Sequence, residues 1–484
     1  MREIINEALN AFEILKISYG EIRAIDKESE VIFLKNGIVE NFSRSEERGY
    51  GIRVFENGGM GFAASNDFSK DKVFETVKKA KKLCEASYKY SSFGYKLNKE
   101  KVSKGVYKSV VLVDPFEVSI EEKLSFMREI DGRLKSSKYS VLRNVILAFF
   151  REKKYFASTE GHDIYQEIYH SGGGYSVYTF KDGILQVRSY PESHGGNYLQ
   201  GGFEVVDKKD FLEKAYVISE EADKLLFAKP APDGIFDLVI MPGQMVLQIH
   251  ESVGHATELD RVLGYEASYA GTSFLTPDDL FKLKYASEIV NIVADATYPK
   301  GLGTFGYDDE GTEAKKIYLI RNGILNGFLS SRDTSLYINS ESSGCARASS
   351  WNRIPIVRMT NINLEPQDRE LEDLISDIKE GFLIDVNKSW SIDEKRLNFQ
   401  FVCEIGYKIE NGKLTGEIVR DPLYYGITPE FWNSCDGIGK DQILYGLLNC
   451  GKGEPGQSMH VGHASPPARF RKVKFGSGSL MSGA

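Results

Sequence analysis

Two histidines flank a carboxylate in the segment His250–His255, which runs His-Glu-Ser-Val-Gly-His. Neutral imidazoles on one helix face can hold a zinc ion, and a neighbouring glutamate can act as general base toward a zinc-bound water. The common form of this pattern, H-E-x-x-H, places its histidines four residues apart. Here they are five apart, so the segment indicates metal-assisted hydrolysis with an unusual helix geometry.

The spacing of this motif predicts a local distortion of the helix. Five residues of an ideal α-helix turn about 500°, which leaves two side chains about 140° apart and unable to chelate one ion. A π-bulge would bring His250 and His255 back together, and such bulges favour functional sites. Gly254 would ease the distortion, because glycine tolerates unusual backbone angles. The alternative is two unrelated histidines on a buried helix.

A strand and a helix must position the motif. Phe236–Met241 is typical of a short buried strand, and Pro242 suits the first position of a helix. Met245, Val246, Leu247 and Ile249 continue an apolar helical pattern into the motif. We therefore expect both histidines on a helix that starts directly from a core strand.

The first half of the chain combines helices with hairpins. Helices are predicted over residues 2–16, 69–87 and 208–227, and another from Ser119, where Glu122 completes a capping-box pattern. Strands are predicted over 30–34, 51–55 and 60–64, and a long β-rich stretch over 141–187, with turns at Asn36-Gly37, Asn57-Gly58 and Asp182-Gly183. Cys84 falls on the inward face of the second helix and is expected in the core.

The second half is mostly β, with further turns at Asn322-Gly323 and Asn411-Gly412 and helices expected over 368–380 and 438–449. Lys229–Gly234 is rich in proline and glycine and is the best candidate boundary. We therefore predict an α+β protein of two domains. Residues 1–228 would form a mixed α/β domain, and 229–484 a mainly antiparallel, β-rich domain that carries the metal-site helix.

Composition excludes several classes of function. The 484 residues carry a net charge of −8, which argues against a general nucleic-acid-binding surface. No apolar run approaches the 18 residues of a membrane span. The N-terminus is amphipathic and acidic, unlike a signal peptide. Five widely spaced cysteines favour a reducing compartment, so we expect a cytoplasmic protein.

A catalytic zinc site needs a third protein ligand beside the two histidines. Glu258 lies about 12 Å along the helix axis from His250, so it is better placed to orient His255 than to bind the metal. Asp260 is close to the motif in sequence as well. The residues alone leave Cys450, His460 and His463 as alternatives.

Cys450 lies in a glycine-rich segment that ends in Gly456-Gln457, and Lys452 would favour its thiolate. Short sequence motifs are spread over nearly the whole chain. They are Ile22-Arg23, Gly49–Val54, Gly61–Ala63, His250–His255 with Glu258 and Asp260, Asp308–Thr312, Pro355 with Arg358–Asn361, and Cys450–Lys452 with Gly456-Gln457. Through their combination the chain resembles the TldD/PmbA family of metalloproteases.

The resemblance implies a zinc peptidase with ligands at His250, His255 and Cys450 and with Glu251 as general base. All four residues are present, as in the catalytic TldD-type subunit and unlike the metal-free TldE/PmbA-type partner. The resemblance further implies a homodimer or a TldD–TldE heterodimer that degrades unfolded peptides or trims leader peptides. It implies no DNA binding, although the family also carries the label modulator of DNA gyrase.

Two segments depart from the family pattern: Lys388–Ile392 replaces a glycine-rich stretch, and 452–457 is two residues longer than usual. An extended substrate could add as a strand to the β-rich half. Asp308, Asp309, Glu310 and Arg358 would then line its cleft, or alternatively form a solvated turn. Two other functions stay open. One is an assembly subunit with a structural metal closed by Glu258, and the other is a hydrolase of small amides.

Overall fold

The computed structural model describes residues 1–90 and 94–478. Long antiparallel strands dominate its first part and form a sheet in the order β3-β2-β1-β5-β6-β4, with β7 and β8 also paired to β6. The strands are β1 (Tyr19–Lys35), β2 (Ile38–Glu56), β3 (Gly59–Ser65), β4 (Lys104–Lys108), β5 (Ser140–Ser158), β6 (Asp163–Lys181), β7 (Ile184–Tyr190) and β8 (Asn197–Gln200).

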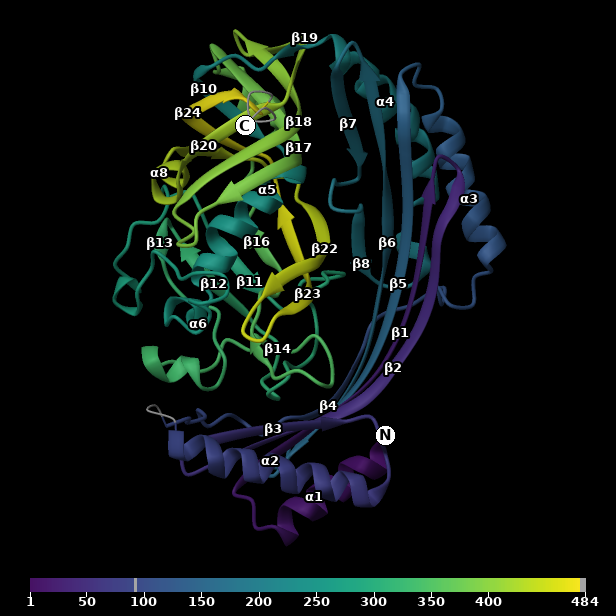
Figure 1. Cartoon of the computed structure of the whole chain (residues 1–484). Helices are drawn as coiled ribbons and strands as arrows, with labels where there is room; N and C mark the ends of the chain where they lie inside the picture. Colours follow the sequence, from purple (N-terminus) through teal and green to yellow (C-terminus); the bar gives the residue numbers. More distant parts are fainter. Residues whose placement is uncertain (91–93, 479–484) are drawn as a thin grey trace.

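Two pairs of helices pack on this sheet, one pair at each end (Figure 1). They are α1 (Arg2–Ile14) with α2 (Lys70–Tyr90), and α3 (Ile120–Leu134) with α4 (Lys208–Phe227). The helices follow the predicted ranges closely. The Ser119 side chain accepts a hydrogen bond from the Glu122 amide at 3.1 Å, as the capping pattern predicts, and Cys84 is buried in the core between α2 and the sheet.

Three consecutive glycines in β6, Gly172–Gly174, allow a neighbouring segment to pack directly against the strand. A Cβ on Gly172 would lie 2.1 Å from the Asn197 carbonyl oxygen, and one on Gly174 would lie 2.4 Å from the Gly196 Cα. Both distances are too short for any side chain. The start of β8 and the loop before it can therefore lie directly against β6, and β6 continues through these glycines.

The second part is built around another sheet, in the order β17-β10-β24-β20-β18-β19-β9, with β21 paired to β24. These strands are β9 (Lys229–Pro230), β10 (Gly234–Ile240), β17 (Glu380–Ile392), β18 (Asn398–Glu410), β19 (Lys413–Arg420), β20 (Pro422–Ile427), β21 (Cys435–Ile438) and β24 (Ala468–Ser477). Most neighbours are antiparallel, while β10–β17 and β19–β9 are parallel. The α+β class with a β-rich C-terminal part is confirmed.

Smaller sheets and short helices complete this part. One sheet has the order β13-β12-β11-β16, and two others are the pairs β14–β15 and β22–β23. The remaining elements are β11 (Ile292–Asp295), β12 (Lys316–Arg321), β13 (Ile324–Leu325), β14 (Ala346–Arg347), β15 (Ile356–Val357), β16 (Ile362–Leu364), β22 (Ile443–Lys452), β23 (Gln457–Ser465), α5 (Pro242–Ile249), α6 (Leu259–Val262), α7 (Leu371–Ser376) and α8 (Thr428–Asn433).

One predicted helix is wrong and another is shorter than predicted. Residues 438–449 form no helix: most of them belong to β22, which pairs with β23. Apolar residues at 443, 444, 447 and 448 imitate a helical period, because a bulge between Leu447 and Cys450 breaks the alternation of the strand. Within 368–380, only Leu371–Ser376 is helical, and β17 begins at Glu380.

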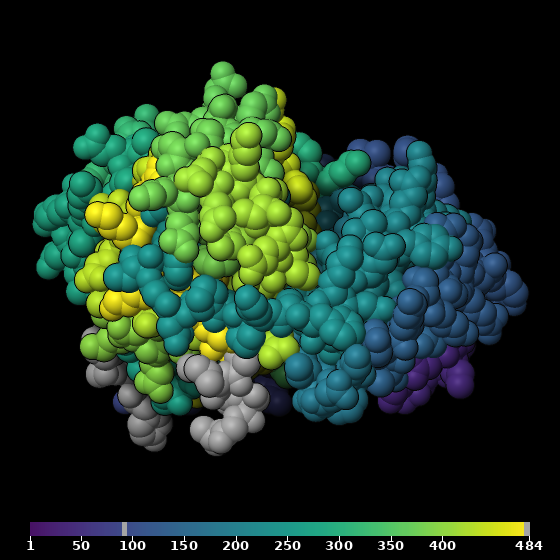
Figure 2. All heavy atoms as spheres, turned by 90° about the horizontal axis from the view of Figure 1, so that it is seen from above, coloured from purple at the N-terminus to yellow at the C-terminus, as the bar shows by residue number. Residues whose placement is uncertain are grey.

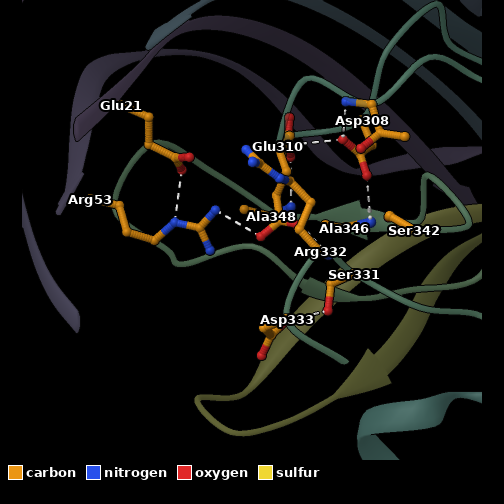
Figure 3. A network of polar contacts seen from close by, with 12 residues as sticks. Glu21, Arg53, Asp308, Glu310, Ser331, Arg332, Asp333, Ser342, Ala346 and Ala348 are labelled. Atoms are coloured by element: carbon orange, nitrogen blue, oxygen red, sulfur yellow. Dashed lines mark hydrogen bonds and ion pairs between the residues drawn. The ribbon is translucent and has the colours of Figure 1, made fainter. Parts of the chain in front are cut away.

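A buried polar network joins the two parts (Figure 3). Arg53, on β2, forms ion pairs at 2.8 Å with Glu21 of β1 and with Glu310 of the second part. The other Glu310 carboxylate oxygen accepts a hydrogen bond from the Arg332 amide at 2.8 Å. Because these charges are buried and paired, separating the parts would leave them unpaired at a high free-energy cost.

The strands divide between the sheets at one place in the chain. The first sheet uses residues 19–200 only, and the second sheet uses residues 229–477 only. We propose 1–228 and 229–484 as the two domains on this basis. From above, the second part (teal to yellow) lies against the first (purple to teal), as Figure 2 shows. Within the described ranges, no helix combines the length and hydropathy needed to cross a membrane.

Candidate metal centre

The motif lies where an α-helix changes to a π-helical turn. Pro242 is the first residue of α5, directly after β10, and the whole helix is buried. His250–Gly254 form the predicted π-helical turn, and a 3-10 turn follows at His255–Thr257. A Cβ on Gly254 would lie 2.4 Å from the Met359 sulfur, so the turn packs too tightly for a larger residue.

The π-helical turn brings the two histidines together, and β22 adds a cysteine. The ligand atoms of His250, His255 and Cys450 all lie within 4.8 Å of one another, and all three residues are buried. The distance from Cys450 Sγ to His255 Nε2 is 3.8 Å. Two imidazoles and a thiolate fit zinc, and three protein ligands leave one tetrahedral position for water or substrate.

The electrostatics of this cluster favour the thiolate. Burial alone would raise the pKa of the Cys450 thiol, but His250, Arg358 and His255 together hold that pKa well below its ordinary value. Burial likewise opposes the charge on His250, yet Cys450 raises the pKa of this histidine above its usual value. The thiolate is the form that binds metal, so the electrostatics around Cys450 suit a cation.

Hydrogen bonds fix the orientation of both imidazoles. His463 donates from Nδ1 to the Ile362 carbonyl at 3.1 Å, and burial lowers the pKa of His463, so its Nε2 is an acceptor. His250 Nδ1 lies 2.8 Å from this atom and therefore donates to it, which leaves His250 Nε2 free for a metal. His255 Nδ1 contacts Glu258 Oε2 at 2.8 Å, so Glu258 orients this histidine as predicted.

Glu258 in turn belongs to a buried ionic cluster around Lys452, whose side chain is fully buried. The Lys452 nitrogen lies 2.6 Å from Asp260, 3.3 Å from Glu258 and 3.9 Å from Glu266. Arg261 supplies a second cation, 2.9 Å from Glu266. The cluster thus holds Glu258 behind His255, and Asp260 lies in this supporting layer.

Glu251 occupies the π-helical turn beside the candidate ligands. Its carboxylate oxygen Oε2 accepts a hydrogen bond from Arg396 Nη1 at 2.6 Å, in an ion pair that is mostly shielded from solvent. Arg396 comes from the turn between β17 and β18, about 145 positions further along the chain. A carboxylate held next to candidate metal ligands can accept and deliver protons.

The other candidate residues lie elsewhere. His460 and His463 are three residues apart on β23 and so point to opposite faces. His460 Nδ1 faces His170 Nδ1 of the first sheet at 2.8 Å. Asp308 and Asp309 line a separate cavity of about 290 Å³ between the two parts. Arg358 donates to the main-chain carbonyls of Cys450 and Gln457 and so supports the β22–β23 hairpin.

Family models cover most of the chain. The model described as PmbA/TldA metallopeptidase domain 1 matches residues 20–84, the central-domain model matches 113–228, and the C-terminal-domain model matches 234–477. The chain belongs to the PmbA/TldA metallopeptidase family. The C-terminal match contains the whole His250–His255 motif and Cys450.

Relatives in this family carry matching names. A metalloprotease of Methanocaldococcus jannaschii is 33% identical over 92% of this chain and 94% of its own length. A metalloprotease of Methanothermobacter thermautotrophicus is 31% identical over 95% of this chain and 96% of its own length. A protein of Saccharolobus solfataricus named zinc metalloprotease TldD homolog is 24% identical over 90% of this chain and 91% of its own length.

Solved structures share the fold of this chain. A Thermotoga maritima protein described as a modulator of a DNA gyrase superposes with a TM-score of 0.77 at 16% identity, covering 98% of this chain and 99% of its own. TldE from Thermococcus kodakarensis gives 0.74 at 18% identity, with the same coverage. At these identities the likeness concerns the fold alone.

Sequence reasoning missed two residues that contact the motif. Arg396 had no signal, because nothing in a single sequence links a turn arginine to Glu251. The sequence offers His463 as a candidate metal ligand, whereas in the structure it orients His250. His463 lies three residues from His460 on β23, and this placement follows only if 438–449 is predicted as a strand that pairs with β23.

Proposed function

We propose that this chain is a zinc-dependent peptidase that hydrolyses peptide bonds in unfolded or extended polypeptides. His250, His255 and Cys450 would hold the metal, and Glu251 would act as general base. The observation that carries the proposal is the meeting of these three side chains within 4.8 Å, although Cys450 lies 195 residues beyond His255. The names of the relatives, metalloprotease and zinc metalloprotease, support the same reaction class.

The residues around the cluster would have separate roles in the reaction. A zinc ion supplies a Lewis acid, which polarises a carbonyl and lowers the pKa of a coordinated water toward about 7. Glu251 takes the proton of the attacking water and delivers it to the leaving amine. His463 and Glu258 keep His250 and His255 in the tautomers that present a free nitrogen.

An extended substrate agrees with the surroundings of Cys450. Among the described residues β22 pairs with β23 alone, so its other edge is not part of a larger sheet. Asn197 bonds the main-chain groups of Leu444 and Gly446 on that edge, and we place an added strand along its remaining residues. Main-chain pairing gives affinity for extended chains without demanding a particular sequence.

A partner subunit completes the proposal. We infer that the chain works as a homodimer or as a heterodimer with a TldE/PmbA-type subunit, and the structural likeness to TldE supports such a pairing. The alternative of an assembly subunit with a structural metal is less well supported. That alternative needs Glu258 as a fourth ligand, whereas Glu258 bonds His255 Nδ1 and lies beside Lys452.

The test combines zinc content with cleavage of casein for the native chain and for Glu251→Ala. We expect zinc in both proteins and cleavage by the native chain alone. Zinc in both with cleavage by neither would indicate a missing partner subunit or a structural site, and adding a TldE-type subunit separates these two. Unchanged cleavage without zinc would overturn the proposal.

A further inference from the structure

The turn that carries Arg396 is fixed to the segment that follows the motif. The Thr272 amide donates to the Glu394 carbonyl at 3.1 Å, and the Phe274 amide donates to the Lys395 carbonyl at 2.8 Å. Main-chain bonds of this kind connect the β17–β18 turn to the chain leaving the metal centre. The Arg396 backbone is therefore held in place, and only its side chain has freedom to change direction.

The guanidinium of Arg396 is incompletely bonded. Nη1 donates to Glu251 Oε2, and the side chain is 15% exposed. Nε is buried without a hydrogen-bond partner, and among the described residues Glu251 is the one carboxylate in an ion pair with Arg396. The charge lies close to the cluster, because its partner Glu251 follows His250 directly in the same π-helical turn.

A guanidinium in this position can meet two kinds of negative charge on a peptide. One is the carbonyl oxygen of the bond being cleaved, and the other is a terminal carboxylate. Glu251 must come within about 3 Å of the attacking water to act as base. A group bonded to Glu251 is therefore within reach of the reacting carbonyl, whereas a terminal carboxylate lies at least one residue, about 3.5 Å, further along the substrate.

We propose that Arg396 is a further catalytic residue, which donates a hydrogen bond to the scissile carbonyl oxygen as negative charge develops there. The inference rests on the peptidase activity proposed above. In the reaction the water oxygen bonds to the carbonyl carbon and the carbon–nitrogen bond breaks. Glu251 carries the proton from water to the amine. Arg396 keeps its own protons throughout, and before the reaction it bonds the Glu251 carboxylate.

The test compares Arg396→Gln and Arg396→Lys with the native chain and with Lys395→Gln, which removes an exposed charge from the same turn. The substrate is an internally quenched, unstructured peptide, prepared with a free and with an amidated C-terminus. A phosphinic analogue of the same peptide, whose second oxygen imitates the developing charge, is titrated by calorimetry. Zinc content is measured for every variant.

For Arg396→Gln we expect kcat to fall by about 10²–10³-fold, the loss typical of one oxyanion donor, with KM changed less than about threefold. Phosphinic-peptide affinity should fall in parallel, while zinc content stays at the native level. Arg396→Lys, which keeps a point charge, should retain part of the native kcat and of the phosphinic-peptide affinity. Lys395→Gln should match the native chain in both quantities.

Other outcomes overturn the inference. A native-like kcat and phosphinic-peptide affinity in Arg396→Gln would show that Arg396 does not stabilise the developing charge. Loss of cleavage on amidating the substrate, with the two substrate forms cleaved equally by Arg396→Gln, would show that the arginine binds a terminal carboxylate instead. If the zinc-loaded native chain, with a TldE-type subunit added, neither cleaves the peptide nor binds its phosphinic analogue, the proposed function fails as a whole.

Discussion

Replacing Lys452 by methionine should strongly destabilise the zinc-loaded protein. The lysine is fully buried and lies within 4 Å of Asp260, Glu258 and Glu266. With Lys452 present, three carboxylates share two cations, and without it Arg261 alone remains. Removing one partner of a buried ion pair costs about 3–5 kcal/mol. For a folding unit of 150–250 residues this corresponds to a fall in melting temperature of about 6–20 °C.

The stability lost in Lys452→Met should depend on pH in a defined direction. Burial raises the pKa of Asp260 and of Glu266, although Lys452 opposes this, so the folded protein binds protons more tightly than the unfolded chain. The free energy of unfolding is therefore greatest below the unfolded pKa, near 4, and falls as pH rises through the folded values. Without Lys452 both values rise further, so the deficit should be smaller at pH 5 than at pH 8.

Calorimetric melting at both pH values measures the effect, with Lys440→Met as the control. Lys440 pairs with Glu370 on the surface, where an ion pair contributes little. We expect a nearly unchanged melting temperature for the control at either pH. A Lys452→Met protein that melts like the control, or whose deficit grows on acidification, would refute the account of the cluster.

Three further outcomes follow from the metal centre. Glu258→Gln should weaken zinc binding by about 10–100-fold in a chelator competition, because His255 loses its orienting carboxylate; native affinity would contradict this. Gly254→Ala should lower the free energy of unfolding by about 1–3 kcal/mol, since its Cβ meets the Met359 sulfur, and the cost should shrink in a Met359→Val background. Stripping zinc with 1,10-phenanthroline should lower the melting temperature, and zinc should restore it; an unchanged melting curve would argue against a bound metal.

Local chemistry made much of the fold predictable. Pro242, the five-residue histidine spacing and Gly254 together predict the π-helical turn, because each acts on the backbone within a few residues. The same holds for the helix at Ser119 and for the hairpin at Asp182-Gly183. These features depend on capping, turn conformation and periodicity, all of which are present in the sequence itself.

Contacts between residues far apart in the sequence limited what could be predicted. The segment 438–449 has helical periodicity, yet pairing with β23 and one bulge make it a strand. The contact between Glu251 and Arg396, and that between His170 and His460, join residues 145 and 290 positions apart. No local pattern encodes such distances. The third candidate ligand, Cys450, was singled out from the residues only as one of three alternatives, and the family resemblance decided among them.

The placement of Cys450 also bears on how the protein is made. During synthesis the two histidines leave the ribosome nearly two hundred residues before the cysteine, and β22 needs β23 to form its hairpin. A nascent chain therefore holds an incomplete set of candidate ligands until both strands of this hairpin have emerged. The proposed peptidase activity would begin only after the hairpin has formed.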